Sequence, residues 1–237
     1  MNINPLYVLP NLFTAGSIFL GIVSIVFASK GSFESSCWLI LFSMVLDGLD
    51  GRVARLTNTA SKFGVEFDSL ADIVAFGVAP ALLLYFYIGS DYGRYGIAVS
   101  AIFVIFGGIR LARFNISTAN SEPGVFIGLP IPSAAAICVL WILIDLKYQI
   151  LPLDLKFLLL ILAFIAGILM VSNVRYPSFK KMRWNLKSLV VLVIIFTGVY
   201  LRPCEVLGGL FSLYVLYGIL RWIFLVVVKI LFKKACN

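Results

Sequence analysis

Long apolar segments recur along this 237-residue chain and constrain its fold more than any other feature of the sequence. A helix needs about 20 apolar residues to cross the hydrocarbon core of a bilayer. The mean hydropathy is +1.06 and 13% of the residues are charged, values far outside the range of soluble globular proteins. We therefore predict an all-α polytopic membrane protein.

Eight candidate spans are separated by short polar turns. They cover residues 11–29, 33–52, 66–89, 93–112, 126–146, 156–172, 187–201 and 206–228. Because no linker is long enough to set off a soluble region, we expect one integral-membrane domain over residues 1–237. The first span is longer than a signal-peptide core and follows no basic region, so we expect it to be retained as a helix.

The net charge of +8 reflects an uneven distribution of basic residues. If the N- and C-termini are cytoplasmic, most of the 19 Lys and Arg residues fall on the cytoplasmic side, as the positive-inside rule expects. We interpret the basic excess as membrane topology and affinity for anionic membrane lipids, without nucleic-acid binding. This orientation suits a bacterial-type cytoplasmic (inner) membrane.

Acidic residues gather in the stretch 46–72, which joins the second and third spans. On its N-terminal side, Asp47 and Asp50 are three residues apart, so on a helix they point the same way. Gly51 and Ala54 fall on that face too. The face therefore carries two carboxylates beside very small side chains.

The C-terminal side of this stretch carries a matching face, because Gly64, Asp68 and Asp72 recur at intervals of four. Glu66 lies off the face, and we interpret it as a solvated charge. The turn that joins the two helices is short, which favours antiparallel neighbours. We therefore predict that four carboxylates meet at the cytoplasmic rim of a membrane cavity.

Composition limits the chemistry of this cluster. The chain has no histidine and its four cysteines are scattered, so histidine bases, histidine triads and paired-cysteine metal sites are excluded. Carboxylate oxygens suit a hard divalent cation such as Mg²⁺ or Mn²⁺. Four carboxylates fit two ions better than one, and a metal pair suits displacement at phosphorus. A structural alternative is that the acids pair with Arg52, Arg55 and Lys62.

The residues beside the acids indicate what the site binds. Gly51 and Ala54 are small enough to let a large phosphorylated substrate approach the backbone. Arg55 follows within a turn and is suited to clamp a phosphate. These residues predict metal-dependent transfer of a phosphate-bearing group at a membrane interface.

The whole motif resembles a known signature. It reads Asp47-x2-Asp50-Gly51-x2-Ala54-Arg55-x8-Gly64-x3-Asp68-x3-Asp72. This pattern is similar at every defined position to the signature of the CDP-alcohol phosphatidyltransferase family. The hydrophobic pattern extends the resemblance over the first six spans, a family core of about residues 1–185. Residues 186–237 would then be additional C-terminal helices.

The resemblance implies a role for each residue of the motif. Asp47, Asp50 and Asp68 would hold one metal ion, and Asp47, Asp68 and Asp72 a second. Asp72 would also be the general base for the acceptor hydroxyl. The residues expected to bind the CDP-diacylglycerol donor are Gly51, Ala54, Arg55, Ser61, Gly64, Asn11 and Thr14. Asn11 and Thr14 are equally well explained as helix caps at the interface.

Two further stretches bear on the acceptor. "GGIRLARFN" (residues 107–115) and "FIGLPIPSAA" (residues 126–135) resemble the branch of the family that uses L-serine. Arg110 and Arg113 lie one turn apart with Asn115 just after, and a guanidinium there suits the serine carboxylate or the lipid-side phosphate. Anchoring by the positive-inside rule is the alternative.

Together these resemblances imply an enzyme of phospholipid synthesis that transfers a phosphatidyl group from CDP-diacylglycerol to L-serine, releasing CMP. Family members are commonly homodimers, so we expect a homodimer. Glycerol 3-phosphate remains open as the acceptor. Two other classes also remain: intramembrane prenyltransferases, whose acidic motifs lie farther apart, and divalent-cation transporters, whose acids are expected at mid-membrane.

Overall fold

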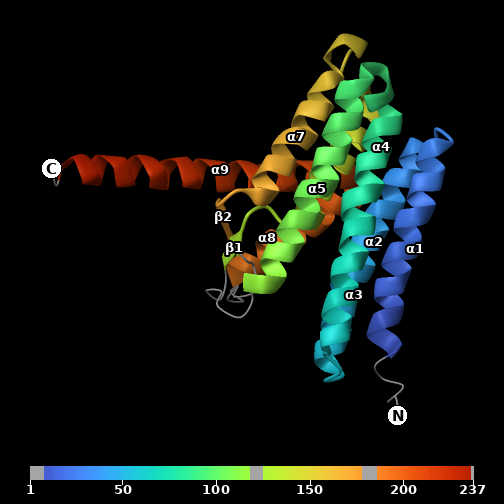
Figure 1. The fold of residues 1–237 in the computed structure, drawn as a ribbon, viewed down its shortest axis with the longest axis horizontal. Coiled ribbons are helices and arrows are strands. Elements are labelled where there is room, and N and C mark those ends of the chain that lie inside the picture. The colour runs from blue at the N-terminus through green and yellow to red at the C-terminus, as the bar shows by residue number, and fades with distance from the viewer. Residues whose placement is uncertain (1–7, 118–124, 178–185, 236–237) are drawn as a thin grey trace.

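A computed structural model describes residues 8–117, 125–177 and 186–235 (Figure 1). Helices make up nearly all of it. The elements follow one another as α1 (Val8–Ser29), α2 (Phe33–Leu56), α3 (Lys62–Asp72), the π-helical η2 (Ile73–Val78), α4 (Ala79–Tyr87), η3 (Gly89–Tyr92), α5 (Arg94–Ser117), β1 (Val125–Ile127), α6 (Ile131–Tyr148), η4 (Leu153–Leu155), α7 (Phe157–Val171), β2 (Arg175–Pro177), α8 (Leu186–Leu201) and α9 (Pro203–Ala235).

Within the described residues, five helical stretches are long and apolar enough to cross a membrane by length and composition. They are Val8–Ser29, Lys62–Tyr87, Arg94–Ile116, Ile131–Tyr148 and Pro203–Leu225. The apolar helices Phe157–Val171 and Val191–Leu201 are shorter, and α2 carries the acidic motif in its last turns. A helical membrane protein is therefore confirmed, whereas the count of eight spans stays a prediction.

Helices α1 and α2 form an antiparallel pair held by buried hydroxyl groups. Ser17 and Ser43 share a hydrogen bond of 2.7 Å, and Ser24 and Ser36 share another of 2.7 Å. All four side chains are fully buried. Small hydroxyl residues let two helices approach closely in an apolar environment, and the bonds satisfy their polar atoms. This pairing fixes the position of α2, which carries the first half of the acidic motif.

The third span is continuous but changes its winding directly after Asp72. Residues Ile73–Val78 are π-helical, and α4 continues the same rod to Tyr87. Such π segments within helices are frequent at functional sites. The neighbouring helix α1 fits closely against this segment at Gly21, where an added Cβ would stand 3.0 Å from the Ala75 Cα. Glycine is therefore required on α1 for the contact.

The segment expected to begin a span at residue 126 begins as a strand instead. Val125–Ile127 (β1) pairs antiparallel with Arg175–Pro177 (β2), which follows α7. Gly128 then turns with φ +79° and donates from its backbone N to Val174 O at 2.8 Å. Helix α6 starts only at Ile131, behind Pro130, so the predicted boundary was wrong by five residues. The backbone at 125–130 pairs with the end of α7 because proline and glycine interrupt the helix there.

Helix α9 departs from the common direction of the bundle. Figure 1 shows it at a steep angle to α1–α5, with its C-terminal half extending away from the other helices. Its first half packs on α6, where the Trp141 Nε1 donates to Ser212 Oγ at 3.2 Å. Farther along, Gly218 lies directly against the ring of the buried Tyr176. Helix α9 thus covers α6 and β2.

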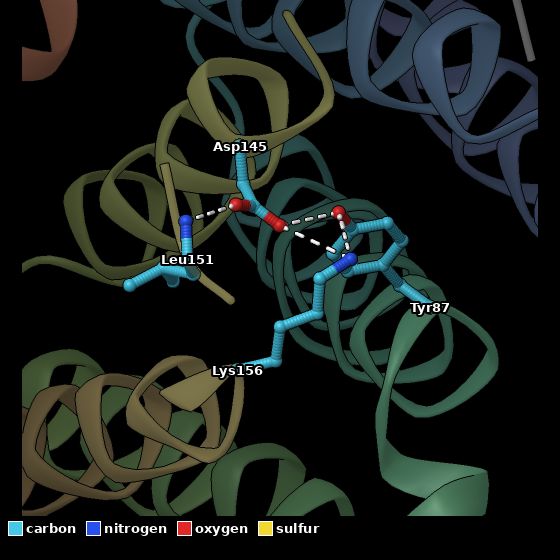
Figure 2. Close-up of polar contacts among 4 residues, drawn as sticks. All are labelled: Tyr87, Asp145, Leu151 and Lys156. Carbon is cyan, nitrogen blue, oxygen red and sulfur yellow. Dashed lines mark hydrogen bonds and ion pairs between the residues drawn. The ribbon is translucent and has the colours of Figure 1, made fainter. Parts of the chain in front are cut away.

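A polar cluster ties together three helices at the end opposite the acidic motif (Figure 2). The Asp145 carboxylate, 2% exposed, accepts hydrogen bonds from the Tyr87 hydroxyl at 2.6 Å and the Leu151 backbone N at 3.0 Å. The Lys156 Nζ lies 3.5 Å from the same carboxylate. The side chains come from α4, α6 and the start of α7, so this buried charge is fully partnered.

We expect Asp145→Ala to lower the apparent Tm of the purified protein by about 6–12 °C, the shift that a loss of about 3 kcal/mol gives in a chain of this size. The substitution leaves the Leu151 N–H and the Lys156 ammonium without their buried acceptor. Thermal unfolding in detergent measures the effect.

The matched control is Lys147→Met, which breaks the shorter Lys147–Glu205 ion pair of 2.7 Å on the surface. Because solvent screens exposed pairs, we expect it to change the Tm little. Equal Tm shifts for the two variants would contradict the structural importance of Asp145.

Candidate active site

Three aspartates of the motif converge between α2 and α3. Asp47, Asp50 and Asp68 each offer a carboxylate oxygen, and these oxygens all lie within 4.8 Å of one another. The helical spacing that placed Asp47 and Asp50 on one face, and the antiparallel α2–α3 turn, are both confirmed. Glu66 is exposed, as expected for a residue off the acidic face.

Asp72 lies one turn beyond Asp68, deeper in the bundle. It is 9% exposed and interacts electrostatically with Asp47, Asp68 and Arg110. Oδ1 of Asp47 and Oδ1 of Asp72 are both buried and accept no hydrogen bond in the described part of the chain. Buried carboxylate oxygens without a partner are costly, and a cation bound at this place would relieve that cost.

The carboxylate oxygens of the four aspartates are suitable ligands for a divalent metal ion. Within the described residues, no Lys or Arg forms an ion pair within 4.0 Å of any of the four aspartates. The structural alternative, in which Arg52, Arg55 and Lys62 neutralise them, is therefore not what the structure contains. Clustered carboxylates with two unpartnered buried oxygens supply the oxygen ligands that hard divalent cations prefer.

A pocket of about 220 Å³ opens beside this cluster. It lies between α1, the end of α2 and the start of α3. All seven residues that the sequence assigned to the CDP-linked donor line it, together with two of the aspartates. The complete lining is Pro10, Asn11, Thr14, Asp50, Gly51, Ala54, Arg55, Thr59, Ala60, Ser61, Gly64, Val65 and Asp68.

The two glycines of the motif differ in how closely they are surrounded. A Cβ added at Gly51 would meet nothing within 4 Å, so a side chain there would project into the open pocket. A Cβ at Gly64 would stand 3.3 Å from the Ser61 Oγ and 3.8 Å from the Asn11 Oδ1. Gly51 therefore leaves room for a ligand, whereas Gly64 lets α1 and the α2–α3 turn approach.

Thr14 has a second role beside its place in the pocket wall. Its Oγ1 donates to Asp50 Oδ2 at 2.7 Å, and it also lies 3.2 Å from Pro10 O. Thr14 is 3% exposed and Asp50 is 5% exposed, so the bond is shielded from solvent. Thr14 is not a helix cap, because it lies inside α1. It fixes the orientation of one carboxylate of the cluster.

The turn between α2 and α3 is fixed at both ends. Ser61 is the N-cap of α3, and its Oγ accepts a hydrogen bond from Gly64 N at 3.0 Å. Asn58 adopts φ +53° directly after α2 and so reverses the chain. Thr59 follows, 6% exposed and part of the pocket wall. Thr59 was not predicted from the sequence. The available signal was Asn58 before it, since asparagine tolerates this left-handed conformation.

The three residues predicted for the acceptor make contacts in different places. Arg113 donates to Val171 O at 3.2 Å and to Asn173 Oδ1 at 2.7 Å, and so binds the end of α7. Asn115 donates to Ser69 Oγ at 3.0 Å, linking α5 to α3.

Only Arg110 faces the aspartates. It is 7% exposed, its guanidinium lies 5.2 Å from the centre of the Phe114 ring, and it interacts with Asp72 and with Tyr214 of α9. Its Nε has no hydrogen-bond partner among the described residues. A buried positive group with an unused donor therefore interacts with Asp72 of the cluster.

Comparisons with known proteins indicate the family to which this chain is similar. The family model described as CDP-alcohol phosphatidyltransferase matches residues 7–169. A Helicobacter pylori strain J99 protein named CDP-diacylglycerol–serine O-phosphatidyltransferase is 60% identical over 99% of this chain and 98% of its own length. A protein of that name from Methanocaldococcus jannaschii is 37% identical over 78% of this chain and 83% of its own.

We expect Thr14→Val to weaken Mn²⁺ binding by about 10–100-fold, the usual effect of losing a hydrogen bond that orients a metal ligand. The variant keeps the shape of the side chain but leaves Asp50 without its donor. Metal titration followed by the rise in thermal stability measures the affinity without any turnover.

Thr14→Ser retains the hydroxyl group and should bind Mn²⁺ nearly as the unmodified protein does. The proposed orientation of Asp50 by Thr14 is wrong if the valine variant keeps full Mn²⁺ affinity.

Proposed function

Because the chain belongs to the CDP-alcohol phosphatidyltransferase family, we propose that it transfers the phosphatidyl group of CDP-diacylglycerol to L-serine, giving phosphatidylserine and CMP. One observation carries the proposal. The motif aspartates converge beside a pocket lined by the predicted nucleotide residues, and the buried guanidinium of Arg110 interacts with Asp72 of the same motif. The donor would bind in the pocket and the acceptor near Arg110.

The pocket beside Gly51 would hold the CDP group of the donor, while the two acyl chains stay in the bilayer. Arg55 lines this pocket from the last turn of α2, and its guanidinium is suited to bind the diphosphate. Gly51 leaves space for the ligand to reach the backbone. Binding at this rim keeps the lipid in the membrane during the reaction.

The resident cofactor would be a pair of Mg²⁺ or Mn²⁺ ions. Asp47, Asp50 and Asp68 would hold one, and Asp47, Asp68 and Asp72 the other. Bound there, the ions would neutralise charge on the diphosphate and on the leaving CMP. The unpartnered oxygens of Asp47 and Asp72 support this assignment.

Asp72 would act as the general base. Its buried Oδ1 would take the proton of the serine hydroxyl, and the serine oxygen would attack the phosphorus that carries diacylglycerol. The bond from this phosphorus to the CMP oxygen breaks, and CMP leaves with the electron pair. Arg110 would bind the serine carboxylate and so hold the hydroxyl near Asp72.

The charge around Arg110 favours serine over glycerol 3-phosphate. A phosphate dianion calls for several cations, but Arg113 is already bonded to Val171 O and Asn173. A single guanidinium, Arg110, matches the single negative charge of a carboxylate. Glycerol 3-phosphate is therefore the weaker candidate.

Topology and assembly complete the proposal. Eight spans would place both termini in the cytoplasm of a bacterial-type cell, with the site facing the cytoplasm. The chain would form one integral-membrane domain with a core of about residues 1–185, in agreement with the family match over residues 7–169. Residues 186–237 would be additional helices, and the enzyme would be a homodimer.

Purified protein given CDP-diacylglycerol and Mn²⁺ or Mg²⁺ should release CMP on addition of L-serine. Release with glycerol 3-phosphate or inositol phosphate should be far slower, because the acceptor site offers one guanidinium. CMP release measured by chromatography gives the rates. Equal rates with glycerol 3-phosphate would exclude serine specificity.

Two variants test the role of Asp72 in this assay. Asp72→Asn should lower the rate with serine by about 10²–10⁴-fold, since the base is lost. Glu66→Gln changes an exposed acid of the same helix and should leave the rate nearly unchanged.

We expect Arg110→Gln to raise the KM for L-serine by about 10–100-fold, the range that the loss of a charge-assisted hydrogen bond produces. The KM for CDP-diacylglycerol should change much less. Steady-state kinetics in mixed micelles measures both constants.

L-Serinamide, which lacks the carboxylate, provides the matched substrate. The unmodified enzyme should prefer L-serine strongly, whereas Arg110→Gln should use the two compounds about equally. A preference retained in the variant would show that another group binds the carboxylate.

A further inference from the structure

The end of α2 brings Thr59 back against the helix that precedes it. Thr59 N donates to Ala54 O at 2.9 Å and Asn58 N donates to Arg55 O at 3.4 Å. With Asn58 at φ +53°, these bonds form a Schellman motif, the common helix ending in which one left-handed residue reverses the chain. Thr59 is thereby fixed beside Ala54, in the wall of the nucleotide pocket.

The hydroxyl hydrogen of Thr59 is already used inside the protein. Thr57 Oγ1 donates its only hydrogen to Val53 O, at 2.8 Å. Thr57 and Thr59 also share a hydrogen bond between their hydroxyl oxygens, 2.7 Å apart. Because Thr57 has no second hydrogen, Thr59 is the donor in this bond. The Thr59 oxygen therefore has only lone pairs left to offer a ligand.

The opposite arrangement is less favourable. For Thr59 to donate to a ligand, Thr57 would have to turn its hydrogen toward Thr59 and give up its bond to Val53 O. One internal hydrogen bond would be lost. Thr59 consequently selects a ligand group that donates a hydrogen bond over one that accepts it.

The parts of a CDP-linked lipid differ in whether they donate or only accept hydrogen bonds. Ionised phosphate oxygens only accept hydrogen bonds, whereas ribose hydroxyls and the exocyclic amine of cytosine donate them. The proposal that follows rests on the proposed function, since it takes this pocket as the CDP site. We propose that Thr59 Oγ1 accepts a hydrogen bond from the nucleoside part of the donor substrate and so contributes to its recognition.

The experiment compares binding of CMP and of inorganic pyrophosphate to the full-length protein with Mn²⁺, by calorimetry in detergent. Thr59→Val keeps the shape of the side chain and leaves the Thr57–Val53 bond intact. We expect it to weaken CMP binding about 3- to 10-fold, the worth of one neutral hydrogen bond, and to leave pyrophosphate binding unchanged. Thr59→Ser should bind CMP as the unmodified protein does.

Three CMP analogues identify the donor group on the ligand. If a ribose hydroxyl is the donor, the analogue that lacks this hydroxyl, 2′-deoxy-CMP or 3′-deoxy-CMP, should bind to the unmodified protein and to Thr59→Val with equal affinity. If the exocyclic amine is the donor, the two proteins should bind UMP equally. A loss in Thr59→Val that persists with all three analogues would overturn the proposal.

Thr197→Val is the matched control, because the Thr197 hydroxyl likewise donates its hydrogen to an acceptor inside the protein, Val193 O, but lies on the exposed part of α8, away from the pocket. It should bind every ligand normally. Equal weakening of CMP and pyrophosphate by Thr59→Val, or no weakening at all, would also overturn the role of Thr59. If the unmodified protein fails to bind CMP, the proposed function itself is wrong.

Discussion

The mutual repulsion of four buried or half-buried carboxylates is the constraint on which the rest of the site depends. Asp47, Asp50 and Asp68 approach within 4.8 Å without a Lys or Arg ion pair in the described part of the chain. Such an arrangement persists only if the backbone holds it, because like charges in a medium of low dielectric constant drive the helices apart. The hydroxyl pairs between α1 and α2, the capped turn at Ser61 and the hydrogen bond from Thr14 supply that support.

Helical periodicity was sufficient to predict the centre of the site. Residues three or four apart share a face whatever the surroundings, so the acidic faces followed directly from the spacing. All seven residues that the resemblance to the family assigned to the donor line the pocket, but the resemblance did not select Thr59, which lines it too. The assignment of Asp72 as base and the pairing of aspartates with individual ions stay predictions, since neither spacing nor geometry distinguishes their roles.

Other features depend on tertiary contacts that no local pattern records. Arg110 and Arg113 lie one turn apart with the same chemistry, yet one faces Asp72 and the other binds the end of α7. The strand at 125–127 forms only because β2, some fifty residues later, returns beside it. Thr59 enters the pocket because of a left-handed residue at Asn58. In each case a partner distant in sequence, or a single backbone angle, decides the outcome.

The π-helical turn between Asp72 and α4 has a consequence for the whole third span. Tyr87, which binds Asp145, and Asp72 lie on one continuous rod, so their relative rotation about the helix axis is fixed by the residues between them. Each residue of an α-helix turns the chain by about 100°. Loss of one residue from 73–78 would therefore rotate one end against the other. The number of residues in this short segment therefore fixes how Asp72 and Tyr87 are oriented relative to each other. With the present length, one helix directs Asp72 toward the acidic cluster and Tyr87 toward Asp145.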